Sequence, residues 1–211
     1  MLEFSEYIKI LVGLIAIVNP FGAVPVFISL TARDTPAQRR DTIHQAALAV
    51  GVILLLAAMS GELLLTFFGI TINSFRVGGG ILVLLMAISM LHARNSPVKQ
   101  TEEEVDESAG RESISVVPLA MPLLAGPGAI STVILAANRG HGAGHILLIA
   151  LCIAALCAVI WTVLNMSPLI VRRLGSTGIN ICTRIMGLIL AAIAVEIIAN
   201  GLKGLFPVLA G

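Results

Sequence analysis

Two clusters of proline and glycine interrupt long apolar runs of the chain, and they are its first candidates for a binding chemistry. One is the Asn-Pro-x-Gly segment 19–22, and the other is the Gly-Pro-Gly segment 126–128. Proline removes a backbone N–H and clashes with the preceding turn, while glycine tolerates unusual backbone angles. Both clusters therefore predict a helix that is broken near its centre. A pair of ordinary proline kinks is the simpler alternative.

A broken helix offers polar backbone groups to a ligand. The second half-helix presents free N–H groups and a positive dipole end, which suit a carboxylate. The first half-helix presents free carbonyls, which suit an ammonium group or a cation. The surroundings are rich in small residues and poor in aromatic ones, so a small zwitterion fits better than a bulky compound. The candidate binding residues are Asn19, Pro20, Gly22, Gly126, Pro127, Gly128, Ser131 and Thr132.

Charged residues near the ends of the apolar runs form a second candidate group. Arg76 opens one run, where a helix dipole disfavours a cation. Two interpretations are open: the side chains extend into the lipid headgroups, or Arg76 pairs with Glu62 or Glu196 in an ion-pair or proton-coupling cluster. The coupling or gating candidates are Glu62, Asn73, Arg76, Asn180, Arg184 and Glu196.

The remaining reactive residue types do not form a recognisable catalytic or metal-binding pattern. The four histidines, His44, His92, His141 and His145, fall in loops or at the ends of apolar runs, and the three cysteines fall inside such runs. No zinc-type spacing, phosphate-binding glycine loop or nucleophile–base pair is evident. We expect no enzyme activity, no metal site and no cofactor.

The composition places the chain in a membrane. It has 211 residues, of which 57% are hydrophobic and 12% charged, a net charge of +1 and a mean hydropathy of +1.00. A soluble domain has about 25% charged residues. These values exclude a soluble globular protein, a disordered chain, a secreted disulfide scaffold and a nucleic-acid binder. The expected surroundings are membrane lipids.

Six runs are long and apolar enough to span a bilayer as helices. They cover residues 7–30, 45–70, 74–91, 114–137, 145–171 and 179–201. Membrane strands would alternate polar and apolar residues, which these runs do not. We expect an all-α polytopic protein with one membrane domain over 1–211. Repeat one spans 1–93, a cytoplasmic linker 94–113, and repeat two 114–211.

The basic residues predict the orientation. Eight Lys and Arg flank the connections after spans one, three and five, against four on the opposite side. Short cytoplasmic loops are enriched in Lys and Arg. Both termini are therefore expected outside the cytoplasm, and we call their side of the membrane the outer face.

The two halves of the sequence resemble each other at a nearly constant offset. Asn19-Pro20 and Gly126-Pro127 are 107 positions apart, as are Ile72-Asn73 and Ile179-Asn180. Each half holds three expected spans, and an odd number makes the second half enter from the opposite side. The pattern predicts an inverted repeat, which recurs among secondary transporters.

The sequence resembles the MarC family of bacterial inner-membrane proteins over essentially its whole length. The resemblance rests on IVNPFGAVPVFISLT, SFRVGGGILV, RESISVVPLAMPLLAGPGAISTVI and GINICTRIMGLIL. It implies six transmembrane helices, a place in the LysE-like transporter superfamily and a bacterial inner-membrane location. Some archaeal members are transporters of small neutral amino acids.

These observations together predict a secondary transporter of small neutral amino acids or similar small zwitterions. Two alternatives stay open: a metal-ion transporter of the same superfamily, which needs several acids at mid-membrane, and a membrane scaffold or sensor without transport. A coupling proton or Na⁺ and a homo-oligomeric state are left open by the sequence.

Overall fold

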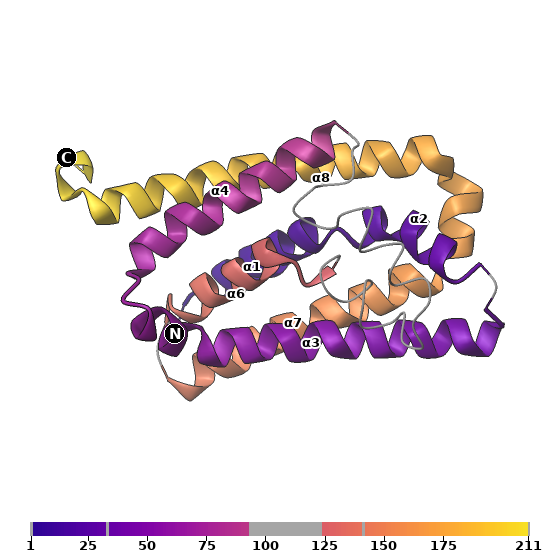
Figure 1. The fold of residues 1–211 in the computed structure, drawn as a ribbon, viewed down its shortest axis with the longest axis horizontal. Coiled ribbons are helices and arrows are strands. Elements are labelled where there is room, and N and C mark those ends of the chain that lie inside the picture. Colours follow the sequence, from indigo (N-terminus) through magenta and orange to yellow (C-terminus); the bar gives the residue numbers. More distant parts are fainter. Residues whose placement is uncertain (1, 33, 93–123, 141, 211) are drawn as a thin grey trace.

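The computed structural model describes residues 2–32, 34–92, 124–140 and 142–210, and every regular element among them is helical. Five helical segments among them are long and apolar enough to cross a membrane, and the first of these segments, Phe4–Leu30, contains a break. The expected linker 94–113 and the first part of the fourth expected span lie outside the described residues. Figure 1 shows the helices lying roughly along one long axis.

The first expected span consists of two helices. α1 covers Phe4–Val18 and α2 covers Pro20–Leu30, and a single non-helical residue, Asn19, separates them. α2 begins on a proline, which suits a first helical position because its missing N–H has no partner there in any helix. The break predicted over residues 19–22 is therefore confined to Asn19.

The next two helices overlap the expected spans 45–70 and 74–91, but the first of them begins nine residues earlier than expected, because its first turns are polar and hydropathy did not mark them. α3 covers Pro36–Phe67, and Thr35 and Gln38 form a capping box at its start. α4 covers Ile72–Leu91, and the hydroxyl of Thr71 accepts a hydrogen bond from the backbone N–H of Ser74. α3 has 32 residues and is about 48 Å long at 1.5 Å per residue, which exceeds the hydrocarbon core of a bilayer.

The second half of the chain holds α6 at Pro127–Ala137, α7 at Ala143–Asn165 and α8 at Ser167–Leu205. A short 3-10 helix, η2, covers Pro207–Ala210. α8 turns a corner at Gly175, whose φ of 61° is open to glycine at little cost (Figure 1).

The fifth expected span extends too far at its C-terminal end. It was predicted over residues 145–171, but α7 ends at Asn165 and α8 begins at Ser167. The physical reason is Pro168, which has no N–H to donate to the Leu164 carbonyl and would clash with that carbonyl in a continuous helix. Apolar residues continue past the end of α7, so hydropathy alone did not mark the boundary.

α4 and α8 pack side by side through glycine (Figure 1). A Cβ atom at Gly187 would lie 3.1 Å from the Ala87 carbonyl oxygen, and one at Gly80 would lie 3.3 Å from the Ala194 carbonyl oxygen. The pairing of early α4 with late α8 makes the two helices antiparallel. Small residues allow such close backbone approach between membrane helices.

The other helices enclose the main apolar core. α1 contacts α6 and α7, and α3 also packs on both of these helices. Branched aliphatic side chains fill most of the interior, at the close packing usual for proteins. The largest fully buried side chains are Phe27, Leu14, Ile17, Ile43, Leu54, Met86, Leu124, Ile149, Ile153, Leu156 and Ile160.

Candidate functional site

The break after α1 is held by Asn19 itself. Its backbone is left-handed, with φ 47° and ψ 65°. Among the residues that the structure describes, it is the only non-glycine residue with a positive φ. Asparagine is among the few residues that enter this region at modest cost. The side chain is 4% exposed, and its Oδ1 accepts a hydrogen bond from the Gly22 N–H at 3.2 Å. Asn19 thus closes one helix and caps the next.

Gly22 is needed for this cap. A Cβ atom at position 22 would overlap the Asn19 amide nitrogen and lie 3.0 Å from its Cγ. Ala23 N–H continues the same turn by donating to the Asn19 carbonyl at 3.3 Å. The Asn-Pro-x-Gly spacing is therefore the local code for an abrupt, reproducible break in the first span.

The second break lies just before α6. Gly126 has extended backbone, with φ −72° and ψ 173°, and the helix starts at Pro127. The break predicted over residues 126–128 is therefore at Ala125–Gly126, and Pro127 and Gly128 already belong to the helix. No side chain caps this N-terminus among the described residues, in contrast to the cap that Asn19 provides for α2.

The two breaks lie close together. A Cβ atom at Gly128, in the first turn of α6, would lie 3.4 Å from Cγ2 of Ile17, in the last turn of α1. The same atom would lie 2.7 Å from the sulfur of Met86 on α4. Gly128 thus allows α6 to approach both α1 and α4, and the face of α6 that carries Gly128 is packed against their side chains.

Ser131 and Thr132 follow one turn later and differ in their surroundings. Ser131 is buried and packs on α4, where a Cβ atom at Gly79 would lie 3.0 Å from the Ser131 Cβ. The Thr132 hydroxyl is shielded from solvent and has no hydrogen-bond partner in the part of the chain that the structure describes. A buried polar group usually has a hydrogen-bond partner, so the unpaired Thr132 hydroxyl is the better candidate of the two for binding a ligand.

The expected ion pair of Arg76 with Glu62 or Glu196 is not formed. The ion pairs within 4.0 Å among the described residues both involve Glu6. Glu62 and Glu196 are exposed, and Arg76 is half-buried, with its Nη1 donating to Asn73 Oδ1 at 3.4 Å. Arg76 instead lies against Gly201 of α8, where the backbones of α4 and α8 approach closely.

The residues that the expected repeat would pair differ in their surroundings. Asn73 packs closely on Gly204 near the end of α8. Asn180 and Arg184 are both exposed on α8. These residues therefore do not share one environment.

The structure adds a polar cluster that the sequence did not indicate. His145 is fully buried, although it was expected at the exposed start of a span. Its Nδ1 lies 2.7 Å from the Tyr7 hydroxyl oxygen, and its Nε2 lies 3.1 Å from the Ala136 carbonyl oxygen. Gly140 leaves room for the ring, because a Cβ there would lie 2.8 Å from His145 Cγ. The sequence signal that could have indicated this cluster is the group of glycines before His145, which leave room for a buried ring.

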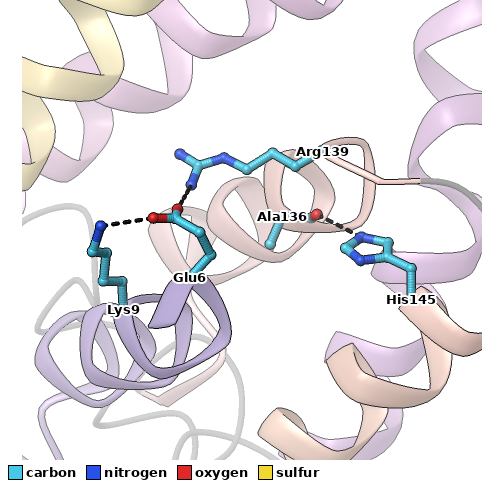
Figure 2. Close-up of polar contacts among 5 residues, drawn as sticks. All are labelled: Glu6, Lys9, Ala136, Arg139 and His145. Carbon is cyan, nitrogen blue, oxygen red and sulfur yellow. Dashed lines mark hydrogen bonds and ion pairs between the residues drawn. The ribbon is translucent and has the colours of Figure 1, made fainter. Parts of the chain in front are cut away.

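Charged residues surround this cluster at the same end of the molecule. Glu6 accepts from Lys9 Nζ at 2.6 Å and pairs with Arg139 Nη1 at 3.8 Å (Figure 2). Figure 2 also shows the His145 ring directed at the Ala136 carbonyl. Glu6 is thus the shared partner of Lys9 and Arg139.

Comparison with known proteins identifies relatives over nearly the whole chain. The family model described as MarC family integral membrane protein matches residues 4–206. The UPF0056 membrane protein YhcE of Escherichia coli is 47% identical over 207 residues, covering 97% of this chain and 95% of the relative. YvbG of Bacillus subtilis is 40% identical over 208 residues, covering 98% of each.

Similarity extends to archaea. A UPF0056 membrane protein of Pyrococcus abyssi is 38% identical over 209 residues, covering 99% of this chain and 100% of the relative. No solved structure matches the chain. The family model and these relatives together show that this chain belongs to the MarC family of integral membrane proteins.

Proposed function

We propose that the chain is a secondary transporter of small neutral amino acids or similar small zwitterions, and that the two helix breaks form its binding site. The observation that carries the proposal is the close approach of the breaks at Asn19 and Gly126, through the packing of Gly128 on Ile17. In a bilayer, backbone groups freed by a break must face protein or a watery cavity. Helices that are interrupted near the middle of the membrane are typical of the binding sites of secondary transporters.

The uncapped start of α6 suits the carboxylate. Pro127 has no N–H, and the N–H groups of Gly128 and Ala129 have no side-chain cap. These groups and the dipole end attract an anion. The unpartnered Thr132 hydroxyl, one turn further, can donate to the same group. The Ala16 carbonyl near the end of α1 would take the ammonium group, since Pro20, four residues later, has no N–H to donate to it.

Helix boundaries support the inverted repeat that the transport proposal needs. α6 begins 107 positions after α2 and ends 107 positions after it, and α7 begins 107 positions after α3. The antiparallel packing of α4 on α8 is what a two-fold axis in the membrane plane would produce. We therefore propose six transmembrane helices in two inverted repeats, with breaks in the first and fourth.

The proposed orientation, in a bacterial inner membrane, places both termini on the outer face, and it can be tested near the C-terminus. Val208 is 94% exposed. In a variant without the three native cysteines, Val208→Cys should react with a membrane-impermeant thiol reagent added to intact cells. The reason is that connections rich in Lys and Arg stay in the cytoplasm, which places the C-terminus on the other side of the membrane. Labelling only after the membrane is permeabilised would reverse the orientation.

The transport proposal is tested by removing the Thr132 hydroxyl. Thr132→Val should lower labelled-alanine flux in proteoliposomes about ten-fold or more, because a hydrogen bond to a charged group contributes about 1.5–3 kcal/mol. It should not destabilise the fold, because the valine leaves no buried hydroxyl unpaired.

A matched control is Thr162→Val. Thr162 is exposed on α7, and its hydroxyl donates to the Ala158 carbonyl of its own helix at 2.7 Å. Its flux should stay within about two-fold of wild type, since such surface changes usually cost less than about 0.5 kcal/mol. Wild-type flux in Thr132→Val would refute the role of this hydroxyl in binding.

A further inference from the structure

His145 joins three helices at one end of the molecule through two hydrogen bonds. The ring belongs to the first turn of α7, Tyr7 to α1, and Ala136 to the last turn of α6. His145 is fully buried, and Tyr7 is 5% exposed. The Cys152 thiol donates to the Tyr7 carbonyl oxygen at 3.6 Å and completes the contact between α1 and α7. This contact holds the α6–α7 connection against α1.

The hydrogen-bond partners define the protonation state that fits this geometry. The Ala136 carbonyl can only accept, so Nε2 carries the hydrogen. In the neutral ring, Nδ1 then accepts from the Tyr7 hydroxyl. In the protonated ring both nitrogens donate, so the Tyr7 oxygen becomes the acceptor and its own hydrogen needs a new partner inside the protein. An unpartnered buried donor is costly, so both hydrogen bonds are satisfied only with the neutral ring.

Charges around the cluster make protonation attainable but do not neutralise it. The C-terminal end of α6 favours a nearby cation. No carboxylate lies within 4.0 Å of the imidazole among the described residues. The titratable groups on the surrounding elements are Tyr7 and Cys152 in the contact itself, and Glu3, Glu6, Lys9, Glu62, Arg76, Arg139 and Glu196 around this end of the molecule. A proton on His145 would thus remain an unpaired buried charge.

The other half of the chain uses a different residue for the corresponding tether. Arg39, in the first turn of α3, donates from Nη2 to the Thr31 carbonyl at the end of α2 at 2.9 Å. The α2–α3 and α6–α7 connections lie at opposite ends of the long axis (Figure 1). Arginine stays charged at all relevant pH values, whereas histidine changes charge between about pH 5 and 8. Only the α6–α7 tether can therefore respond to pH.

We infer that His145 is a proton-binding site that acts as a latch: the neutral ring holds α1, α6 and α7 together, and proton uptake releases Tyr7 and loosens this end. In the proposed orientation the latch faces the outer side, so its role in gating rests on the proposed transport function. Its protonation does not rest on that function.

Tyr7 gives a direct readout, because it is the single tyrosine and Trp161 the single tryptophan of the chain. In purified Trp161→Phe protein, Tyr7 fluorescence should change in one step between about pH 5 and 8. The additional change His145→Gln should abolish this step, because glutamine can donate from its amide NH2 group and accept at its amide oxygen but does not titrate. His92→Gln is the matched control: His92 is exposed, bonds to the Ile88 carbonyl of its own helix, and should leave the step unchanged.

A step that survives in His145→Gln, or the absence of any step, would overturn the latch. If His145→Gln does not fold, Tyr7→Phe replaces it, with thermal unfolding as the readout. The unfolding temperature of Tyr7→Phe should fall less between pH 7.5 and 5.5 than that of the wild-type protein, since no hydroxyl is left without a partner. An equal fall in the two proteins would contradict the latch.

The pH profile of alanine flux separates the latch from the transport proposal. Wild-type flux should change across the same pH range, and flux in His145→Gln should be flat. Absence of flux at every pH would refute the transport proposal, while the Tyr7 measurement would still decide whether His145 binds the proton.

Discussion

Gly187→Val is expected to be the most destabilising single substitution considered for the helix framework. A Cβ atom at this position would lie 3.0 Å from Met90 Cβ, 3.1 Å from the Ala87 oxygen and 3.2 Å from the Leu91 nitrogen. Two of these three atoms belong to the backbone of α4, so no side-chain rotation can relieve the overlap. α4 and α8 must separate, and overpacking of this kind costs about 1–3 kcal/mol.

The measurement is thermal unfolding of the purified protein in detergent or nanodiscs. Gly78→Val is the matched control, because a Cβ atom at Gly78 meets no atom within 4 Å and the residue lies on the same helix pair. It should change stability by less than about 0.5 kcal/mol. Equal unfolding temperatures for the two variants would show that the α4–α8 contact does not depend on glycine.

Gly22→Ala should have the second largest effect, and it should act on transport as well as stability. The added methyl group would displace the Asn19 side chain, whose cap on α2 contributes about 1 kcal/mol. Without the cap, the left-handed turn at Asn19 loses its support and the break changes geometry. We expect alanine flux at the background level and a lower unfolding temperature.

Gly13→Ala separates this effect from a general sensitivity of the first span. Gly13 is buried on α1, and a Cβ atom there would meet only Cδ1 of Ile193, at an ordinary 3.9 Å. Flux and stability should remain close to wild type. A Gly22→Ala protein with normal flux would mean that the geometry of the first break is not required for transport.

The sequence predicted the helices and breaks because their causes are local. Proline and glycine act on their own turns, so the segments at Asn19 and before Pro127 could be located from residue type and spacing. The end of α7 was missed because apolar residues continue beyond it and hydropathy does not weigh Pro168 against the Leu164 carbonyl.

Contacts between helices could not be predicted in the same way. His145 and Tyr7 are 138 positions apart, and their hydrogen bond depends on how α1 and α7 pack. Arg76 was expected to pair with an acid because charge suggests a partner, but the orientation of Glu62 and Glu196 depends on helix rotation, which one sequence does not determine.

The central claim is that this chain moves small zwitterions through a site at the two breaks, and substrate flux in proteoliposomes tests it most directly. Purified wild-type protein should catalyse saturable flux of labelled alanine, with competition by unlabelled glycine and little competition by lysine or glutamate. Flux of a divalent metal ion such as Mn²⁺ should equal that of empty liposomes. Metal-ion flux without alanine flux would favour a metal transporter, and absence of both would contradict transport and favour a scaffold or sensor.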